Sequence, residues 1–139
     1  MLKRGIWVIV GLFLFSCAQL EKRVTLEDRV RNYWMAIVSL DFTKAYGFEY
    51  PLYRKMVPLR AYVSRMSGGG IVTIKSFRVL KKKVSGDRAE VTIKLDMVVK
   101  PPFERKGLEI HPVRKDVWIR VDGVWYHVPE EYEKLRGSK

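Results

Sequence analysis

The sequence predicts an α+β domain in which N-terminal helices pack on one face of an antiparallel sheet. From Thr25 to about Met66, apolar residues recur every three or four positions, which is the period of an amphipathic helix. After the glycines 68–70, apolar and polar residues alternate, and turn signals separate the runs, as in strands joined by hairpins. Helices that precede hairpin-linked strands make an α+β fold.

The first 16 residues have the pattern of an export signal. Lys3 and Arg4 precede an apolar run over residues 6–15, which is too short for a permanent membrane-spanning helix of about 20 residues. Ser16 comes directly before Cys17, the single cysteine of the chain, so no intramolecular disulfide can form. The alternatives are an uncleaved anchor and an ordinary signal peptide with an incidental cysteine.

The residues at the expected cleavage point resemble the lipobox of bacterial lipoproteins, with Leu14 at minus three, Ser16 at minus one and Cys17 at plus one. The resemblance implies that Cys17 is acylated and becomes the mature N-terminus, and several acyl chains on one residue are enough for stable anchoring. Ala18 and Gln19 follow, where aspartate would retain many Gram-negative lipoproteins at the inner membrane. We therefore expect a periplasm-facing protein, lipid-anchored in the bacterial cell envelope, with the outer membrane favoured in a Gram-negative organism.

The length of 139 residues is enough for one domain. We expect a signal peptide over 1–16, the lipidated cysteine and a tether over 17–24, the domain over 25–129 and a C-terminal tail over 130–139. The net charge is +12, with 27 lysines and arginines against 15 acids, and such a field favours anionic surroundings such as phospholipid headgroups or lipopolysaccharide. No nucleic-acid partner is expected, because the chain is exported and carries no nucleic-acid-binding motif.

Four helices are expected in the first half. Thr25 caps the first helix, whose apolar residues run from Leu26 to Leu40. Asp41 begins a short second helix that ends at Gly47. Prolines 51 and 58 introduce two more helices, around 52–56 and from 59 to about 66.

Two hairpins are expected in the second half. The first joins residues 71–85 to 89–97 through the turn Ser85-Gly86-Asp87, and the second joins 113–121 to 124–128 through Asp122-Gly123. Two adjacent prolines, Pro101 and Pro102, stop the strand before them, so the charged segment 103–112 is expected to be a loop. The tail from Glu130 to Lys139 is expected to add a frayed helical turn.

Several strings carry a family resemblance across about residues 25–128: Arg31-Asn-Tyr-Trp34, Asp41-Phe-Thr-Lys-Ala-Tyr46, Tyr50-Pro-Leu-Tyr-Arg54, Gly86-Asp-Arg-Ala-Glu-Val91 and Trp118-Ile-Arg-Val-Asp-Gly-Val-Trp-Tyr-His127. With the order of elements, they resemble the nuclear transport factor two-like (cystatin-like cone) superfamily, in its small bacterial lipoprotein branch. The resemblance implies a curved sheet that wraps around the long helix as a cone with a pocket. It implies a fold rather than a function.

The residues expected to line such a pocket are Trp34, Tyr46, Phe77, Asp96 and Trp118. Aromatic clusters of this kind are either core or the wall of a cavity for a small apolar ligand. Asp96 points either to solvent beside Lys94 or into the cone, where burial would raise its pKa and make it a general base. The solvent orientation is favoured, because buried unpaired acids are rare.

No catalytic residue, cofactor or metal site is predicted. Enzymes of the superfamily, such as ketosteroid isomerase and scytalone dehydratase, place Asp, His and Tyr side chains in the cone. Here the two histidines, His111 and His127, have no metal-ligand spacing, and each is interpreted as a surface or packing residue. No nucleophile motif or phosphate loop occurs.

The run Lys81, Lys82 and Lys83 is either a solvated strand end or part of a face that binds anionic envelope material. We therefore expect a lipid-anchored, non-enzymatic envelope protein that binds a small apolar ligand or an envelope partner. The alternatives are a cone-pocket enzyme of the isomerase or dehydratase type and an assembly subunit of an envelope or secretion complex.

Overall fold

The computed structural model of the chain describes residues 23–137. The predicted signal peptide and Cys17 lie outside the described residues. The elements are α1 (Leu26–Val38), α2 (Phe42–Tyr46), α3 (Pro51–Met56), α4 (Leu59–Ser67), the 3-10 turn η1 (Gly68–Gly70), β1 (Val72–Ser85), β2 (Arg88–Val99), β3 (Leu108–Ile110), β4 (Val113–Val121), β5 (Val124–Val128) and α5 (Glu130–Gly137). Within this range, no helix is both long enough and apolar enough to cross a membrane.

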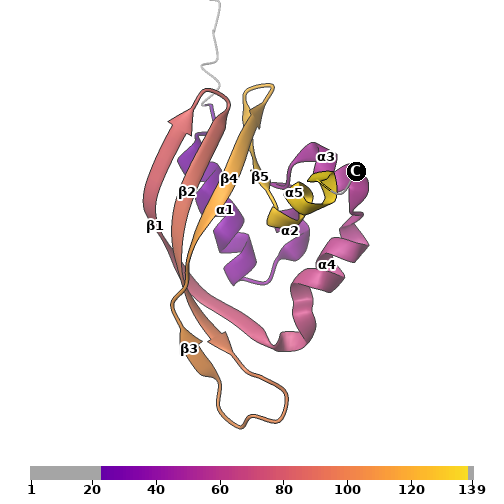
Figure 1. Cartoon of the computed structure of the whole chain (residues 1–139), viewed down its shortest axis with the longest axis vertical. Helices are drawn as coiled ribbons and strands as arrows, with labels where there is room; N and C mark the ends of the chain where they lie inside the picture. The colour runs from indigo at the N-terminus through magenta and orange to yellow at the C-terminus, as the bar shows by residue number, and fades with distance from the viewer. Residues whose placement is uncertain (1–22, 138–139) are drawn as a thin grey trace, which may run out of the picture.

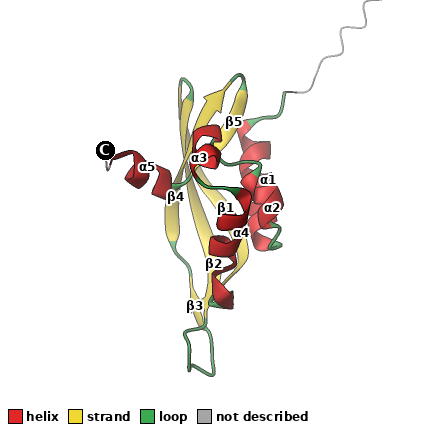
Figure 2. Ribbon diagram, turned by 90° about the vertical axis from the view of Figure 1, so that its right-hand side faces the viewer, coloured by secondary structure: helices red, strands yellow, loops and turns green. Residues whose placement is uncertain are grey.

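Helix α1 begins where the sequence predicts. The Thr25 hydroxyl accepts a hydrogen bond from the backbone N–H of Asp28 at 3.2 Å, which satisfies one of the free donors of the first turn. The helix ends two residues before the expected Leu40, which lies in a turn with a φ of 60°. Figure 1 shows α1 lying along the sheet, and Figure 2 shows α1, α2 and α4 on one side of the sheet with α5 on the other.

The sheet is antiparallel and has the strand order β1-β2-β4-β5, while β3 pairs with the far end of β2. The alternation predicted for β2 is confirmed, because Ala89, Val91, Ile93 and Leu95 are all buried. Strand β1 shifts register between Ile74 and Ser76 and again between Val79 and Lys81. Extra residues of this kind bend a strand and increase its twist, so β1 curves with the sheet.

The predicted α+β fold is therefore confirmed, and two local predictions are wrong. Leu108–Ile110 lies in the expected loop but forms β3. The chain there passes so close to β2 that a Cβ on Gly107 would lie 2.3 Å from Val98 Cγ1, and only glycine permits such an approach. The tail forms α5 rather than a frayed turn, because Tyr132 is buried with its ring centroid 5.3 Å from that of Tyr50.

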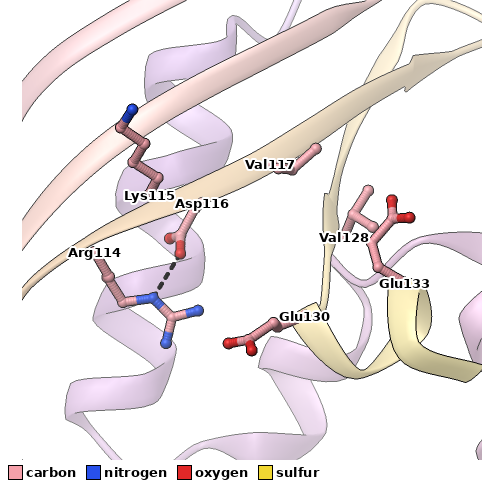
Figure 3. A pocket seen from close by; sticks show the side chains of 7 residues that line it. All are labelled: Arg114, Lys115, Asp116, Val117, Val128, Glu130 and Glu133. Carbon is pink, nitrogen blue, oxygen red and sulfur yellow. Dashed lines mark hydrogen bonds and ion pairs between the residues drawn. The ribbon is translucent and has the colours of Figure 1, made fainter.

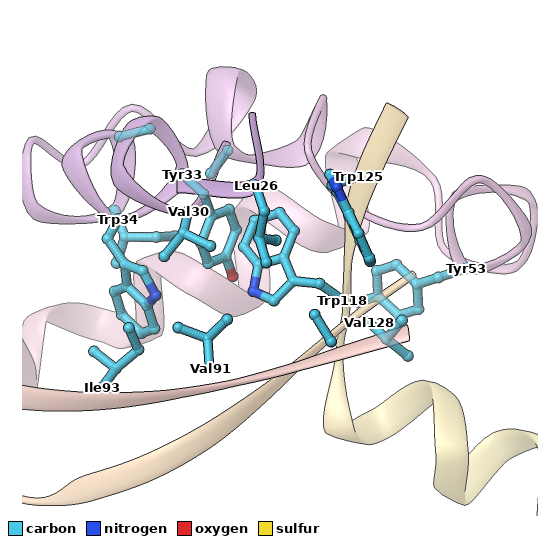
Figure 4. Packing of buried hydrophobic residues seen from close by; sticks show 14 of the residues in the cluster. Leu26, Val30, Tyr33, Trp34, Tyr53, Val91, Ile93, Trp118, Trp125 and Val128 are labelled. Carbon is cyan, nitrogen blue, oxygen red and sulfur yellow. The ribbon is translucent and has the colours of Figure 1, made fainter. Parts of the chain in front are cut away.

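Aromatic side chains fill the space between α1 and the sheet (Figure 4). The Tyr33 ring meets Trp34 edge to face at 5.5 Å between centroids, and it meets Trp118 in the same way at 5.8 Å. Edge-to-face contacts are a favoured geometry of aromatic pairs. Trp118 is 0% exposed and Trp34 is 3% exposed, so both rings belong to the core.

Candidate functional site

A row of charged side chains crosses this core and consists of Glu49, His127, Asp116 and Arg114. Backbone pairing at the edge of the sheet sets the position of the row. The backbone N–H of Tyr50 donates to His127 O, and the N–H of His127 donates to Phe48 O, both at 2.8 Å. The segment between α2 and α3 therefore runs parallel to β5, with Glu49 directly opposite His127. Both side chains are almost completely buried.

The Glu49 carboxylate accepts hydrogen bonds from three side chains. Tyr33 and Tyr62 donate their hydroxyls to Oε1 at 3.1 and 2.8 Å. His127 Nδ1 lies 2.8 Å from Oε2. Burying a carboxylate is unfavourable unless it is paired and hydrogen-bonded, and here both oxygens have partners.

Asp116 of β4 continues the row on the other side of the imidazole. Its Oδ2 accepts a hydrogen bond from the indole N–H of Trp34 at 2.9 Å, and its Oδ1 accepts one from the Nε–H of Arg114 at 2.8 Å. His127 Nε2 lies 3.8 Å from Asp116 Oδ1, which is within ion-pair range but too long for a hydrogen bond. The charges therefore alternate in sign from Glu49 through His127 and Asp116 to Arg114.

This arrangement shifts the pKa of the groups within it. Burial alone lowers the pKa of His127, but the charge of Glu49 and the contact with Asp116 outweigh it and raise the pKa to about 9. Burial alone raises the pKa of Asp116, but His127, Arg114 and Trp34 outweigh it, and the pKa lies below the usual value. Burial and the neighbouring Glu49 raise the pKa of Tyr33 and Tyr62. At neutral pH, His127 is therefore an imidazolium, and it lies between Glu49 and Asp116.

A surface cleft borders the row at Arg114 and Asp116. This cleft has a volume of about 340 Å³ and is lined by Arg114, Lys115, Asp116, Val117, Val128, Glu130 and Glu133 (Figure 3). It lies where β5 has ended, since the pairing of β4 with β5 stops at Val117 and Val128. Of the row, only Arg114 and Asp116 border it.

A general acid or base has to lie within hydrogen-bond reach of its substrate. His127 does not line this cleft. The Asp116 carboxylate does line it, but Arg114 and Trp34 occupy both of its oxygens. Among residues 23–137, no three His, Cys, Asp or Glu side chains are arranged to hold a metal ion. The row is therefore suited to holding α1, the Glu49 segment and the sheet together.

The structure brings together four of the five residues predicted to line a pocket. Trp34 and Trp118 are core residues, and Phe77 packs 6.2 Å from the Trp34 ring. Tyr46 is half-buried and donates its hydroxyl to Arg54 O at 3.1 Å and to Val57 O at 2.8 Å. Their side chains pack on one another or on backbone.

Asp96 does not belong with them. Its neighbour Leu95 faces the core, so alternation turns Asp96 to the opposite face, where its side chain is 49% exposed. It accepts the Ser76 hydroxyl at 2.5 Å and contacts His111 Nδ1 at 2.7 Å. These two contacts lower its pKa, whereas burial in a cone would have raised it. Both groups bind the same carboxylate, so the imidazole is not placed to take the serine proton as in a nucleophilic triad.

The sequence did not predict that Glu49, Asp116 and His127 form a group. One signal was present: Asp116 and Trp118 are two residues apart on a strand and therefore share a face. An acid on the core face of a strand requires a buried partner. Nothing in the sequence pointed to Glu49, because its partner is 78 residues away.

The opposite face of the sheet carries a group of cations. We define the outer basic face as Arg78, Lys81, Lys83, Lys94 and Lys115. Directly opposed residues of antiparallel strands share a face. Lys81 and Lys115 flank Thr92, Arg78 is opposite Lys94, and Lys83 is opposite Glu90. Val91 and Ile93 are buried against the helices, so Thr92 and Lys94 point outward. None of the five cations forms an ion pair with any residue of 23–137.

The strand divides the predicted run of three lysines between two faces. Lys82 is opposite the buried Val91 and forms an ion pair with Glu27 of α1. Lys81 and Lys83 lie on the outer basic face. The run is therefore not one patch, and only two of its three charges face outward.

A scan against protein-family models found no match, and neither did a search of curated proteins. Solved structures do match. A SEC-C motif-containing protein from Rhodopseudomonas palustris has a TM-score of 0.60 and 17% identity, covering 77% of each chain. A SEC-C motif-containing protein from Psychrobacter arcticus has a TM-score of 0.52 and 18% identity, covering 78% of this chain and 60% of its own.

An NTF2-like protein from Cytophaga hutchinsonii matches with a TM-score of 0.54 and 12% identity, over 78% of this chain and 93% of that one. At these identities, the likeness concerns the fold and not the activity. It agrees with the helices and the curved antiparallel sheet described above. The chain has the fold of the nuclear transport factor two-like (NTF2-like) superfamily.

Proposed function

We propose that the protein is a lipid-anchored, non-enzymatic component of the bacterial cell envelope that binds an anionic envelope component through its outer basic face. The observation that carries the proposal is the set of five cations on one sheet face that form no ion pair among residues 23–137, whereas β2 contributes only two acids, Glu90 and Asp96, to that face. A cluster of cations on one face creates a positive potential that attracts anions.

The predicted lipid anchor would hold the outer basic face close to the membrane. A tether of eight residues, 17–24, spans at most about 27 Å when fully extended. An acylated Cys17 would therefore keep the domain within reach of lipid headgroups. A Lys or Arg near an anionic membrane surface contributes about 1 kcal/mol to binding.

The expected apolar ligand and the alternative of a cone-pocket enzyme receive less support. The rings of Trp34 and Trp118 occupy the cone interior, which argues against an apolar ligand in that position. An isomerase or dehydratase needs a titratable group that is free to meet substrate. The oxygens of Glu49 and Asp116 are already hydrogen-bonded to neighbouring side chains.

Vesicle binding tests the role of the basic face. Among residues 23–137, every buried core residue lies between Leu26 and Tyr132, so the mature chain 17–139 with Cys17→Ser carries that core without acyl chains. We expect this chain to cosediment with phosphatidylglycerol vesicles and not with phosphatidylcholine vesicles. Equal binding to both would contradict the proposal.

A matched pair of variants tests which face binds. Lys81→Gln and Lys82→Gln each remove one charge from neighbouring positions. Lys81→Gln should weaken binding about fivefold, while Lys82→Gln, on the helix-facing side, should have a smaller effect. Equal effects would mean that net charge alone drives binding.

The anchor itself is tested by mass spectrometry of the native protein from membranes, and an unmodified Cys17 would overturn the lipid-anchored localisation.

A further inference from the structure

The loop between β2 and β3 ends in a completely exposed aromatic residue. Phe103 has a relative exposure of 105% and belongs to no part of the hydrophobic core. Figure 1 shows this loop projecting beyond the sheet, at the end of the long axis opposite to the first described residues. Leu108, where the chain leaves the loop, is also 64% exposed.

The backbone of Phe103 is in a conformation that aromatic residues rarely adopt. The N–H of Glu104 donates to Pro101 O at 3.2 Å, which closes a β-turn with Pro102 and Phe103 in its centre. Phe103 has a φ of 75°, and a positive φ at this turn position normally calls for glycine. Strain of this kind persists where it serves a purpose, and no core contact of the Phe103 ring offsets it.

Cations surround this aromatic tip. Lys100, Arg105 and Lys106 flank Phe103, and Glu104 is the one acid of the segment 100–108. The three cations form no ion pair with residues 23–137. An exposed aromatic ring beside unpaired Lys and Arg matches the lipid interface, where the ring enters the acyl boundary and the cations meet anionic headgroups.

We propose that the loop 100–108 inserts Phe103 into the interfacial region of an anionic bilayer. The proposal rests on the function proposed above and adds an apolar contact to it. The loop and the first described residues lie at opposite ends of the long axis (Figure 1). Insertion would therefore lay the strands along the membrane, with the outer basic face towards the same surface.

A tryptophan placed at the tip reports insertion directly. In the mature chain 17–139 with Cys17→Ser, Trp34, Trp118 and Trp125 are buried, so Phe103→Trp adds an exposed fluorophore. With phosphatidylglycerol vesicles, we expect its emission to shift to the blue and to be quenched by doxyl-labelled lipid. Met35→Trp, at a residue 54% exposed on α1, is the control and should show neither change.

A second variant measures the contribution of the ring to affinity. Phe103→Ser should weaken binding to phosphatidylglycerol vesicles about tenfold or more, because the burial of a phenylalanine ring is lost. Its circular dichroism spectrum should match that of the parent chain, since Phe103 makes no core contact.

The outcomes separate the two proposals. If Phe103→Trp shows no blue shift while binding still depends on Lys81, the loop proposal is overturned and the basic face stands. If no vesicle binding occurs at all, both proposals fail for lipid. A blue shift that appears with a partner protein and not with vesicles would assign the loop to protein recognition and would also overturn the proposal.

Discussion

His127 Nδ1 lies 2.8 Å from Glu49 Oε2 inside the core, although the two residues are 78 positions apart in the chain. The parallel bridge between their backbones sets this distance. The pair connects the segment after α2 to the last strand of the sheet. A buried pair of this kind is destabilising when one partner is removed, because the other charge is left without compensation.

Glu49→Ala should therefore lower the free energy of unfolding by about 3–5 kcal/mol. The substitution leaves the imidazolium and the hydroxyls of Tyr33 and Tyr62 without their acceptor. Urea denaturation measures the change. Glu109→Ala is the control, because its ion pair with Lys75 is exposed, and it should change stability by less than about 0.5 kcal/mol. A Glu49→Ala chain as stable as the parent would show that the pair is not structural.

Stability should also fall at alkaline pH. Its neighbours raise the pKa of His127 in the folded chain to about 9, above the ordinary histidine value of 6.5. The contribution of the charged imidazole to the free energy of unfolding is therefore fully present below about pH 6.5 and is lost as the pH rises through 9. From these two pKa values it is on the order of 3 kcal/mol. Urea denaturation at several pH values between about 6 and 10 measures how the free energy of unfolding changes with pH. This dependence should be weaker in His127→Gln. A flat profile in the parent chain would contradict the charged pair.

The sequence predicted correctly the elements that depend on residues close together in the chain, such as caps, alternating strands and tight turns. The predicted Thr25 cap and the strict alternation of β2 are confirmed. So is the turn at Asp122 and Gly123, which both have the positive φ of a two-residue hairpin. Strand β3 and helix α5 were missed, because β3 exists only through pairing with β2, and α5 packs through one aromatic residue, Tyr132.

The candidate site was less accessible to sequence reasoning, because tertiary pairing creates it. Asp96 and Asp116 both lie in strands of alternating pattern, yet one faces solvent and the other the core. The sequence also presents Lys81 and Lys82 as one run. Because β1 has two register shifts, the alternation of side chains along this strand does not by itself show which face of the sheet carries Lys81 and which carries Lys82.

Phe103→Gly should leave the domain as stable as before or more stable, by up to about 1 kcal/mol. Glycine adopts a φ of 75° without strain, although its greater freedom in the unfolded chain offsets part of the gain. Thermal and urea unfolding measure the difference. Phe77→Ala is the contrast, because the Phe77 ring packs on Trp34 and its removal should lower stability. A clear loss of stability in Phe103→Gly would mean that the Phe103 ring packs against the domain.

The two proposed membrane contacts should respond differently to salt. Raising the salt concentration from about 0.1 M to about 1 M shortens the Debye length from about 10 Å to about 3 Å, which screens the exposed cations of the outer basic face. Cosedimentation with phosphatidylglycerol vesicles should therefore weaken, and Lys81→Gln should show a shallower salt dependence than Lys82→Gln. Apolar burial of the Phe103 ring does not depend on screening. The binding that remains at high salt should therefore be abolished by Phe103→Ser. Binding that is independent of salt in the parent chain would remove the outer basic face from the contact.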